Sequence, residues 1–115
     1  MSNHSAYRTF VDRLSKTKDS AREKSTKKRK SLGLRTAREN LDDLVDPGSF
    51  LEFGAFAVAA QRNRRDYEEL QLETSADGIL TGFCNINEDE VGEDNSHAAA
   101  IIYDYSVLAL SLIHI

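Results

Sequence analysis

The chain has 115 residues, of which 40% are hydrophobic and 30% are charged, and its net charge is -4. This length suits one small domain, and no apolar run reaches the roughly 18 residues that a membrane span requires. The polar N-terminus lacks the apolar stretch of a secretory signal, and a single cysteine cannot form an internal disulfide, so a cytoplasmic protein is expected.

The charge is divided unevenly along the chain. Residues 1–40 carry 12 Lys and Arg against 4 Asp and Glu, whereas residues 41–115 carry 3 against 15. The cations concentrate at residues 24–30, where no aromatic side chain is interleaved for base stacking. This stretch is compatible with a solvated charged helix, with a site for a phosphate-bearing small ligand, or with binding to any polyanion. A small polyanion- or nucleic-acid-binding module is therefore the alternative function, although the absence of a nucleic-acid motif disfavours it.

The first half of the chain is expected to be helical. Apolar residues at helical spacing predict an amphipathic helix over residues 6–14, followed at 15–31 by a basic segment that either continues the helix as a solvated arm or is partly disordered. Thr36 and Glu39 have the spacing of a capping box, which predicts the start of a second amphipathic helix. Pro47 cannot continue that helix, so the helix should end near Val45 or Asp46.

The second half is expected to form strands. The pattern predicts an extended aromatic segment at residues 50–56, a short helix at 67–72 and a turn at 74–78. Two strands follow, at residues 79–86 and 98–109, and an acidic turn at 87–96 joins them. In the first strand Leu80, Gly82 and Cys84 alternate onto one side. The second strand is continuously apolar, which predicts burial on both faces and hence an incomplete domain in which something else must cover it.

Few residues have the pattern of a catalytic or metal site. The three histidines, His4, His97 and His114, match no metal-binding spacing, and Cys84 has the pattern of a small buried hydrophobe. The carboxylates of residues 88–94 lack the ligand order of a calcium loop, so a solvated turn is expected. Asp104 lies in an apolar run, where an unpaired carboxylate is costly, and it therefore requires a partner, more commonly for structure than for function.

The order of these segments is similar to a known family. The sequence RTARENLDDLVDPGSF at residues 35–50, followed by Glu52 and by Gly54 and Ala55, resembles the N-terminal region of the carboxyltransferase domain of biotin-dependent acyl-CoA carboxylases. ADGILTG at residues 76–82 and YDYSVLA at residues 103–109 resemble the same family, in the expected order. The resemblance runs from about residue 22 to residue 109 and is of the acetyl- or propionyl-CoA carboxylase type.

This resemblance implies a fold, a reaction and a set of partners. The expected fold class is α/β, an N-terminal fragment of a crotonase-like (ClpP/crotonase) domain with helices followed by a β-hairpin. The family transfers a carboxyl group from carboxybiotin, held on a carrier domain, to an acyl-CoA, and backbone N–H groups stabilise the anions that form. The implied partners are biotin carboxylase, the biotin carrier protein or domain, and further copies of the full-length subunit; neither a membrane nor a nucleic acid is implied.

The resemblance also divides the chain. Residues 1–34 are expected to form a basic, largely helical arm, residues 35–109 the start of the acyl-CoA carboxyltransferase N-terminal domain, and residues 110–115 a tail outside the family pattern. The glycine-rich catalytic segments of the family follow the matching strand and are absent here, so the fragment is expected to be inactive alone and no catalytic residue is assigned. Arg35 and Arg38 are candidates to approach the CoA phosphates, with capping or salt-bridging of their own helix as the alternative.

Overall fold

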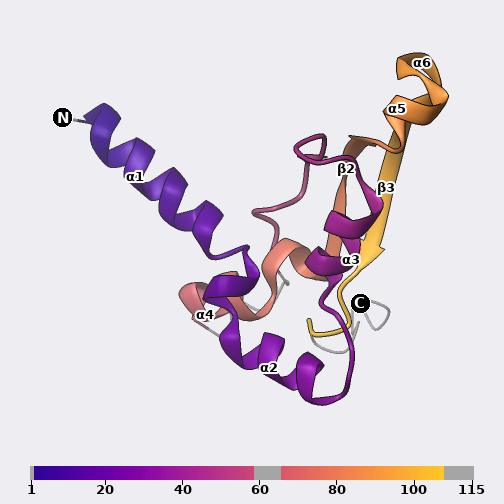
Figure 1. Ribbon diagram of the computed structural model, residues 1–115. Coiled ribbons are helices and arrows are strands. Elements are labelled where there is room, and N and C mark those ends of the chain that lie inside the picture. The colour runs from indigo at the N-terminus through magenta and orange to yellow at the C-terminus, as the bar shows by residue number, and fades with distance from the viewer. Residues whose placement is uncertain (1, 59–65, 108–115) are drawn as a thin grey trace.

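A computed structural model describes residues 2–58 and 66–107 (Figure 1). Its elements in chain order are α1 (Ser2–Ser15), the 3-10 turn η1 (Asp19–Ala21), α2 (Glu23–Ser31), α3 (Ala37–Leu44), β1 (Leu51–Glu52), α4 (Tyr67–Glu73), the 3-10 turn η2 (Ser75–Gly78), β2 (Ile79–Asn85), α5 (Glu88–Val91), α6 (Glu93–Ser96) and β3 (His97–Tyr103). None of these described helices combines the length and the apolar character needed to cross a membrane.

The basic arm is helical, but it is not one continuous solvated helix. It breaks after Ser15, where the hydroxyl of Thr17 donates to the carbonyl of Leu14, and again at Arg22. Thr17 and Arg22 are both buried. The break at Arg22 allows its guanidinium to reach the body of the protein, so burial of one cation overrides the helix propensity of its neighbours.

The predicted capping box of α3 is confirmed. The hydroxyl of Thr36 accepts from the backbone N–H of Glu39 at 3.1 Å, and the Thr36 N–H donates to the Glu39 carboxylate at 3.1 Å. A hydrogen bond from Lys30 at 2.9 Å and the bond from Thr36 lower the pKa of Glu39. The helix ends at Leu44 with Val45 extended, as the proline predicts.

Removing the cap should weaken the protein. Thr36→Ala deletes the acceptor for the Glu39 N–H and the donor to Asp19, which receives the hydroxyl at 2.5 Å. We expect a loss of about 1 kcal/mol in the free energy of unfolding, measured by urea denaturation with far-UV circular dichroism. Thr36→Ser, which keeps the hydroxyl, is the control, and equal stability of the two variants would contradict the role of the cap.

The strands form a three-stranded antiparallel sheet in the order β1-β2-β3 rather than the expected hairpin alone. The alternation predicted for β2 is confirmed, because its even-numbered residues are buried and its odd-numbered residues are not. The even-numbered face packs against α3, and the core consists of Ala37, Leu41, Val45, Ala76, Leu80, Cys84 and Ala100. The other face of the sheet carries exposed side chains.

Two predicted segments differ from the structure. The extended segment predicted at residues 50–56 pairs as a strand only at Leu51–Glu52, because the chain turns at Gly54, whose carbonyl accepts from the N–H of Ala57. The acidic turn contains the short helices α5 and α6. The carboxylate of Asp46 accepts the N–H groups of Asn87 and Glu88 at 2.9 and 3.0 Å, which satisfies the start of α5 from a distant part of the chain.

The last strand is shorter and less buried than predicted. β3 ends at Tyr103, so Asp104 follows the strand rather than lying within it. Its outer side chains are open, with Ile101 66% and Tyr103 59% exposed, so the described residues bury only one face of the strand and do not supply the cover that the prediction of an incomplete domain requires. The short helix expected at 67–72 and the turn at 74–78 are confirmed as α4 and η2. Residues 108–115, which include the predicted tail and His114, lie outside the described residues.

Candidate functional site

Arg38 joins three parts of the chain. It stands in the first turn of α3 and donates to both carboxylate oxygens of Glu52 in β1, at 2.9 and 3.0 Å, while its Nε donates to the carbonyl of Thr17 at 2.8 Å. Both side chains are nearly buried, at 13% and 12% exposed. This two-pronged pair fixes α3 to β1 and to the arm. A CoA phosphate that binds Arg38 would have to compete with the Glu52 carboxylate. The role of Arg38 toward CoA therefore stays a prediction.

Arg35 is held much more loosely. Its guanidinium donates to Asn40 at 2.8 Å and to Asp43 at 3.2 Å, and the Arg35 and Asp43 side chains are 54% and 70% exposed. Such a surface pair contributes little, at about 0–1 kcal/mol, so a ligand phosphate can replace the carboxylate at small cost. Arg35 is thus paired with side chains of α3, the helix that it precedes, and it remains half exposed; its role toward CoA stays a prediction.

The partner that Asp104 requires is Arg22. Their side chains meet at 3.0 Å and are 11% and 6% exposed, and Arg22 also donates to the carbonyl of Leu72 at 2.7 Å and to the hydroxyl of Ser106. The second oxygen of Asp104 accepts from the N–H and the hydroxyl of Ser106. This network is a structural salt bridge. Sequence reasoning required a cation for Asp104 but did not single out Arg22, because 82 positions separate them.

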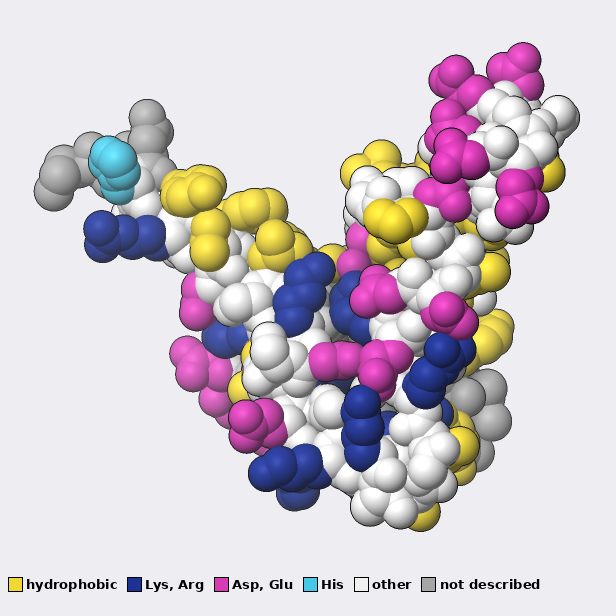
Figure 2. All heavy atoms as spheres, in the orientation of Figure 1, with side chains coloured by type: hydrophobic (Ala, Val, Ile, Leu, Met, Phe, Trp, Pro, Cys, Tyr) yellow, Lys and Arg dark blue, Asp and Glu magenta, His cyan; other side chains and the backbone are white. Residues whose placement is uncertain are grey.

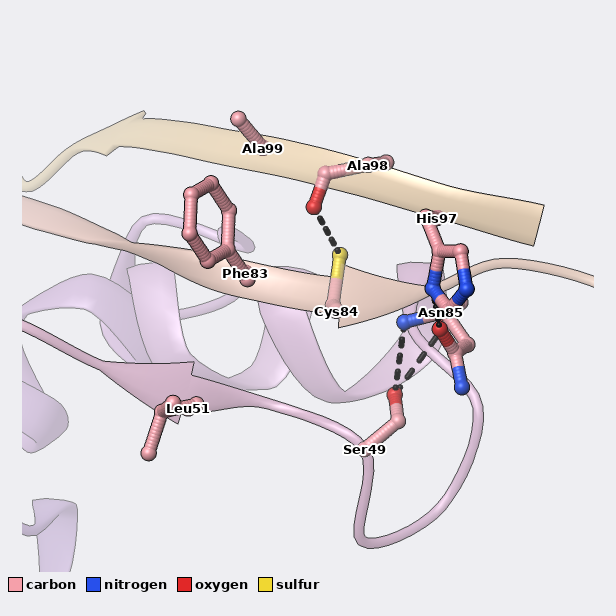
Figure 3. A pocket seen from close by; sticks show the side chains of 8 residues that line it. All are labelled: Ser49, Leu51, Phe83, Cys84, Asn85, His97, Ala98 and Ala99. Carbon is pink, nitrogen blue, oxygen red and sulfur yellow. Dashed lines mark hydrogen bonds between the residues drawn. The ribbon is translucent and has the colours of Figure 1, made fainter. Parts of the chain in front are cut away.

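A pocket of about 520 Å³ opens on the outer side of the sheet near its end (Figure 3). Its polar wall consists of Ser49, Asn85 and His97. The Nδ1 of His97 lies 2.8 Å from the side-chain oxygen of Asn85, and the hydroxyl of Ser49 exchanges hydrogen bonds with the backbone of Asn85. Leu51, Phe83, Ala98 and Ala99 supply the apolar wall. The polar groups thus bind one another, and the space beside them is mainly apolar.

Cys84 borders this pocket but has no nucleophilic character. Its thiol donates to the carbonyl of Ala98 at 3.6 Å, and burial, together with the negative charge of Asp46, raises its pKa. The thiol therefore stays protonated at neutral pH, and the interpretation of Cys84 as a small buried hydrophobe is confirmed.

The other charged candidates lie at separate ends of the molecule. The cations of α2 occupy a helix without a buried residue, where Lys30 pairs with Glu39. The carboxylates of α5 and α6 gather at the tip of the β2–β3 connection (Figure 2). Within residues 2–58 and 66–107, no three His, Cys, Asp or Glu side chains are grouped to hold a metal ion. His4 lies on α1, far along the chain from His97.

Comparisons with known proteins identify relatives of this arrangement. No family model matches the chain. The chain is 38% identical over 81 residues to the biotin-dependent long chain acyl-coenzyme A carboxylase beta4 subunit of Mycobacterium tuberculosis (strain ATCC 25618 / H37Rv). The 81 matched residues make up 70% of this chain and 14% of that subunit.

Solved structures agree. A single-chain, multi-domain long-chain acyl-CoA carboxylase superposes with a TM-score of 0.86 at 46% identity, over 90% of this chain and 10% of that one. The transcarboxylase 12S hexamer, with methylmalonyl-coenzyme A and methylmalonic acid bound, superposes with a TM-score of 0.65 at 28% identity, over 90% of this chain and 18% of that one. The chain therefore spans about one seventh of the length of the curated relative it matches.

Proposed function

We propose that the chain corresponds to a part of the carboxyltransferase of biotin-dependent acyl-CoA carboxylases, and that it supplies part of an enzyme that moves a carboxyl group from carboxybiotin to an acyl-CoA. The observation that carries the proposal is the superposition of 90% of the chain on a long-chain acyl-CoA carboxylase at 46% identity. The acyl group is left open, since the relatives act on or bind long-chain and methylmalonyl groups.

The proposed partners follow from the same relatives. Carboxybiotin reaches a carboxyltransferase on a biotin carrier that a biotin carboxylase has loaded, so these are the partners of the full-length subunit. The transcarboxylase 12S relative is a hexamer, which supports a homo-oligomer of the full-length subunit. The 115-residue chain by itself should not turn over acetyl-, propionyl- or long-chain acyl-CoA, and measurable carboxyl transfer by the isolated chain would contradict the proposal.

Within this function Arg35 is the better placed of the two candidates, Arg35 and Arg38, for a CoA phosphate. Its guanidinium is half exposed and its pairing with Asp43 is weak, whereas Arg38 is engaged by Glu52. A charged hydrogen bond of this kind contributes about 1.5–3 kcal/mol. The chain itself supplies no glycine-rich oxyanion segment, so its described residues bind and position rather than react.

Arg35 can be tested in a chimera in which this chain's matched residues replace those of the beta4 subunit. Arg35→Ala should raise the KM for the acyl-CoA about tenfold with kcat nearly unchanged, because the contact is made equally in the ground and transition states. Lys27→Ala, which removes an exposed cation of α2 within the matched region, is the matched control. Identical KM values for both variants would remove Arg35 from the site.

The alternative function, a polyanion-binding module, rests on α2, whose five cations lie on a helix that buries nothing. It predicts micromolar binding of the isolated chain to nucleic acid with a steep dependence on salt. Failure of the isolated chain to retard a labelled duplex at low salt would eliminate this function and leave the carboxyltransferase proposal untouched.

A further inference from the structure

Arg29 closes the connection between α2 and α3 (Figure 1). Its carbonyl accepts the N–H groups of Leu32 and Leu34 at 3.1 and 3.0 Å, and Gly33 between them has a φ of +73°, the left-handed conformation that ends many helices. Its guanidinium reaches across the same turn, where Nε and Nη2 both donate to the carbonyl of Arg35, at 3.2 and 3.0 Å. One residue therefore fixes the turn through both its backbone and its side chain.

The peptide group between Arg35 and Thr36 is held from both sides. Arg29 donates to its carbonyl oxygen, and its N–H donates to the Glu39 carboxylate at 3.1 Å. Lys30 in turn donates to Glu39 at 2.9 Å. Hydrogen bonds to charged groups are stronger than neutral ones, and here both ends of one peptide group bind a charged side chain. The plane of this peptide, and with it the direction in which the Arg35 side chain leaves the backbone, is thus fixed.

Arg29 differs in this respect from the other cations of α2. Of the five cations of the helix, Arg29 is half-buried, whereas the four lysines are exposed. A planar guanidinium can direct two N–H groups in a fixed geometry onto one oxygen, whereas a lysine ammonium is a single point charge on a flexible stem. The position that contacts the Arg35 carbonyl is therefore the one at which the helix carries an arginine.

The fixed peptide matters because the Arg35 side chain beyond it is held only by Asn40 and by Asp43, and is 54% exposed. Ordering a long side chain when a ligand binds costs affinity, and a group that is already held in its binding position avoids part of that cost. Contacts that fix the backbone of Arg35 therefore bear on how tightly its guanidinium can bind an anion.

We propose that Arg29 is a positioning residue for Arg35, and that it holds the Arg35 peptide so that the Arg35 guanidinium is presented to a phosphate of the acyl-CoA. This inference rests on the proposed function, in which Arg35 contacts CoA. Arg29 acts through the Arg35 carbonyl and does not itself bind the ligand.

Equilibrium binding of coenzyme A to the chimera with the beta4 subunit, measured by isothermal titration calorimetry, tests this role. Arg29→Ala should raise the dissociation constant for coenzyme A about fivefold, which is the cost of ordering one long side chain. The kcat at saturating acyl-CoA should stay nearly unchanged. Lys27→Ala removes the same charge from an exposed position of the same helix, so it is the matched control and should leave the dissociation constant unchanged.

A double-mutant cycle separates positioning from direct contact. Because Arg29 acts through Arg35, Arg29→Ala should add nothing to the dissociation constant in an Arg35→Ala background. Circular dichroism melts establish that each variant folds. Arg29→Met keeps the aliphatic part of the side chain in α2 and has no donor, so it should give the same result as Arg29→Ala and replaces that variant if alanine prevents folding.

Three results would overturn the inference, and each has a different meaning. A dissociation constant that Arg35→Ala leaves unchanged would remove Arg35 from the site, and Arg29 with it. An effect of Arg35→Ala without one of Arg29→Ala or Arg29→Met would remove Arg29 alone. An equal further rise from Arg29→Ala in the Arg35→Ala background would show that Arg29 does not act through Arg35. Carboxyl transfer by the unsubstituted chimera, measured separately, tests the proposed function itself.

Discussion

Gly82→Ala should be among the most destabilising substitutions in this chain. A Cβ at this position would overlap the carbonyl oxygen of Leu51 and lie 2.7 Å from the ring of Phe50. The first contact is with backbone that pairs in register with β2, so no side-chain rotation relieves it and β1 must separate from β2. We expect a loss of about 3 kcal/mol or more in the free energy of unfolding, measured by urea denaturation.

Gly48→Ala is the matched control for this prediction. Gly48 has a φ of +74°, and a Cβ added there would meet nothing within 4 Å, so alanine at this position introduces backbone strain without a clash. That strain is worth about 1 kcal/mol. Equal losses for the two variants would show that close approach of β1 to β2 is not what requires glycine at position 82.

The second large effect is expected at the buried pair of Arg22 and Asp104. Asp104→Asn keeps the shape of the side chain but leaves the guanidinium, 6% exposed, without its counter-charge. Breaking one partner of a buried pair costs about 3–5 kcal/mol. Asp43→Asn removes the partner of exposed Arg35 and should cost less than about 1 kcal/mol under the same urea denaturation.

A double-mutant cycle completes this test. Arg22→Met fills similar space without charge, and combined with Asp104→Asn it removes both ions, so the double variant should be more stable than the sum of the single losses predicts. Additive losses, or an Asp104→Asn variant as stable as Asp43→Asn, would show that the pair does not hold the arm to the body.

Local patterns made part of this structure predictable. The capping box and the proline determine α3 within a few residues, and the alternation of Leu80, Gly82 and Cys84 identifies the buried face of β2. Each of these signals acts over fewer than ten residues, and over so short a stretch the positions of residues in the sequence determine their positions in the structure.

Long-range contacts explain what the patterns missed. The arm breaks at Arg22 because of a carboxylate 82 positions away, and α5 begins where Asp46, more than 40 positions away, accepts two of its N–H groups. The apolar composition of β3 predicts burial of its outer side, which the described residues leave exposed, because composition does not say which part of a protein provides the cover. The candidate site shows the same limit, since Arg35 and Arg38 look alike in sequence, and the positions of Glu52 and of the Thr17 carbonyl distinguish them.

The most direct test of the central claim is the rate of biotin-dependent carboxylation by the chimera of this chain and the beta4 subunit. If the chain is part of a carboxyltransferase, the chimera should carboxylate a long-chain acyl-CoA, or acetyl- or propionyl-CoA, at a rate within about tenfold of the parent subunit, because equivalent segments preserve the packing of the site. A chimera that folds and assembles like the parent but transfers no carboxyl group to any of these substrates would contradict the account.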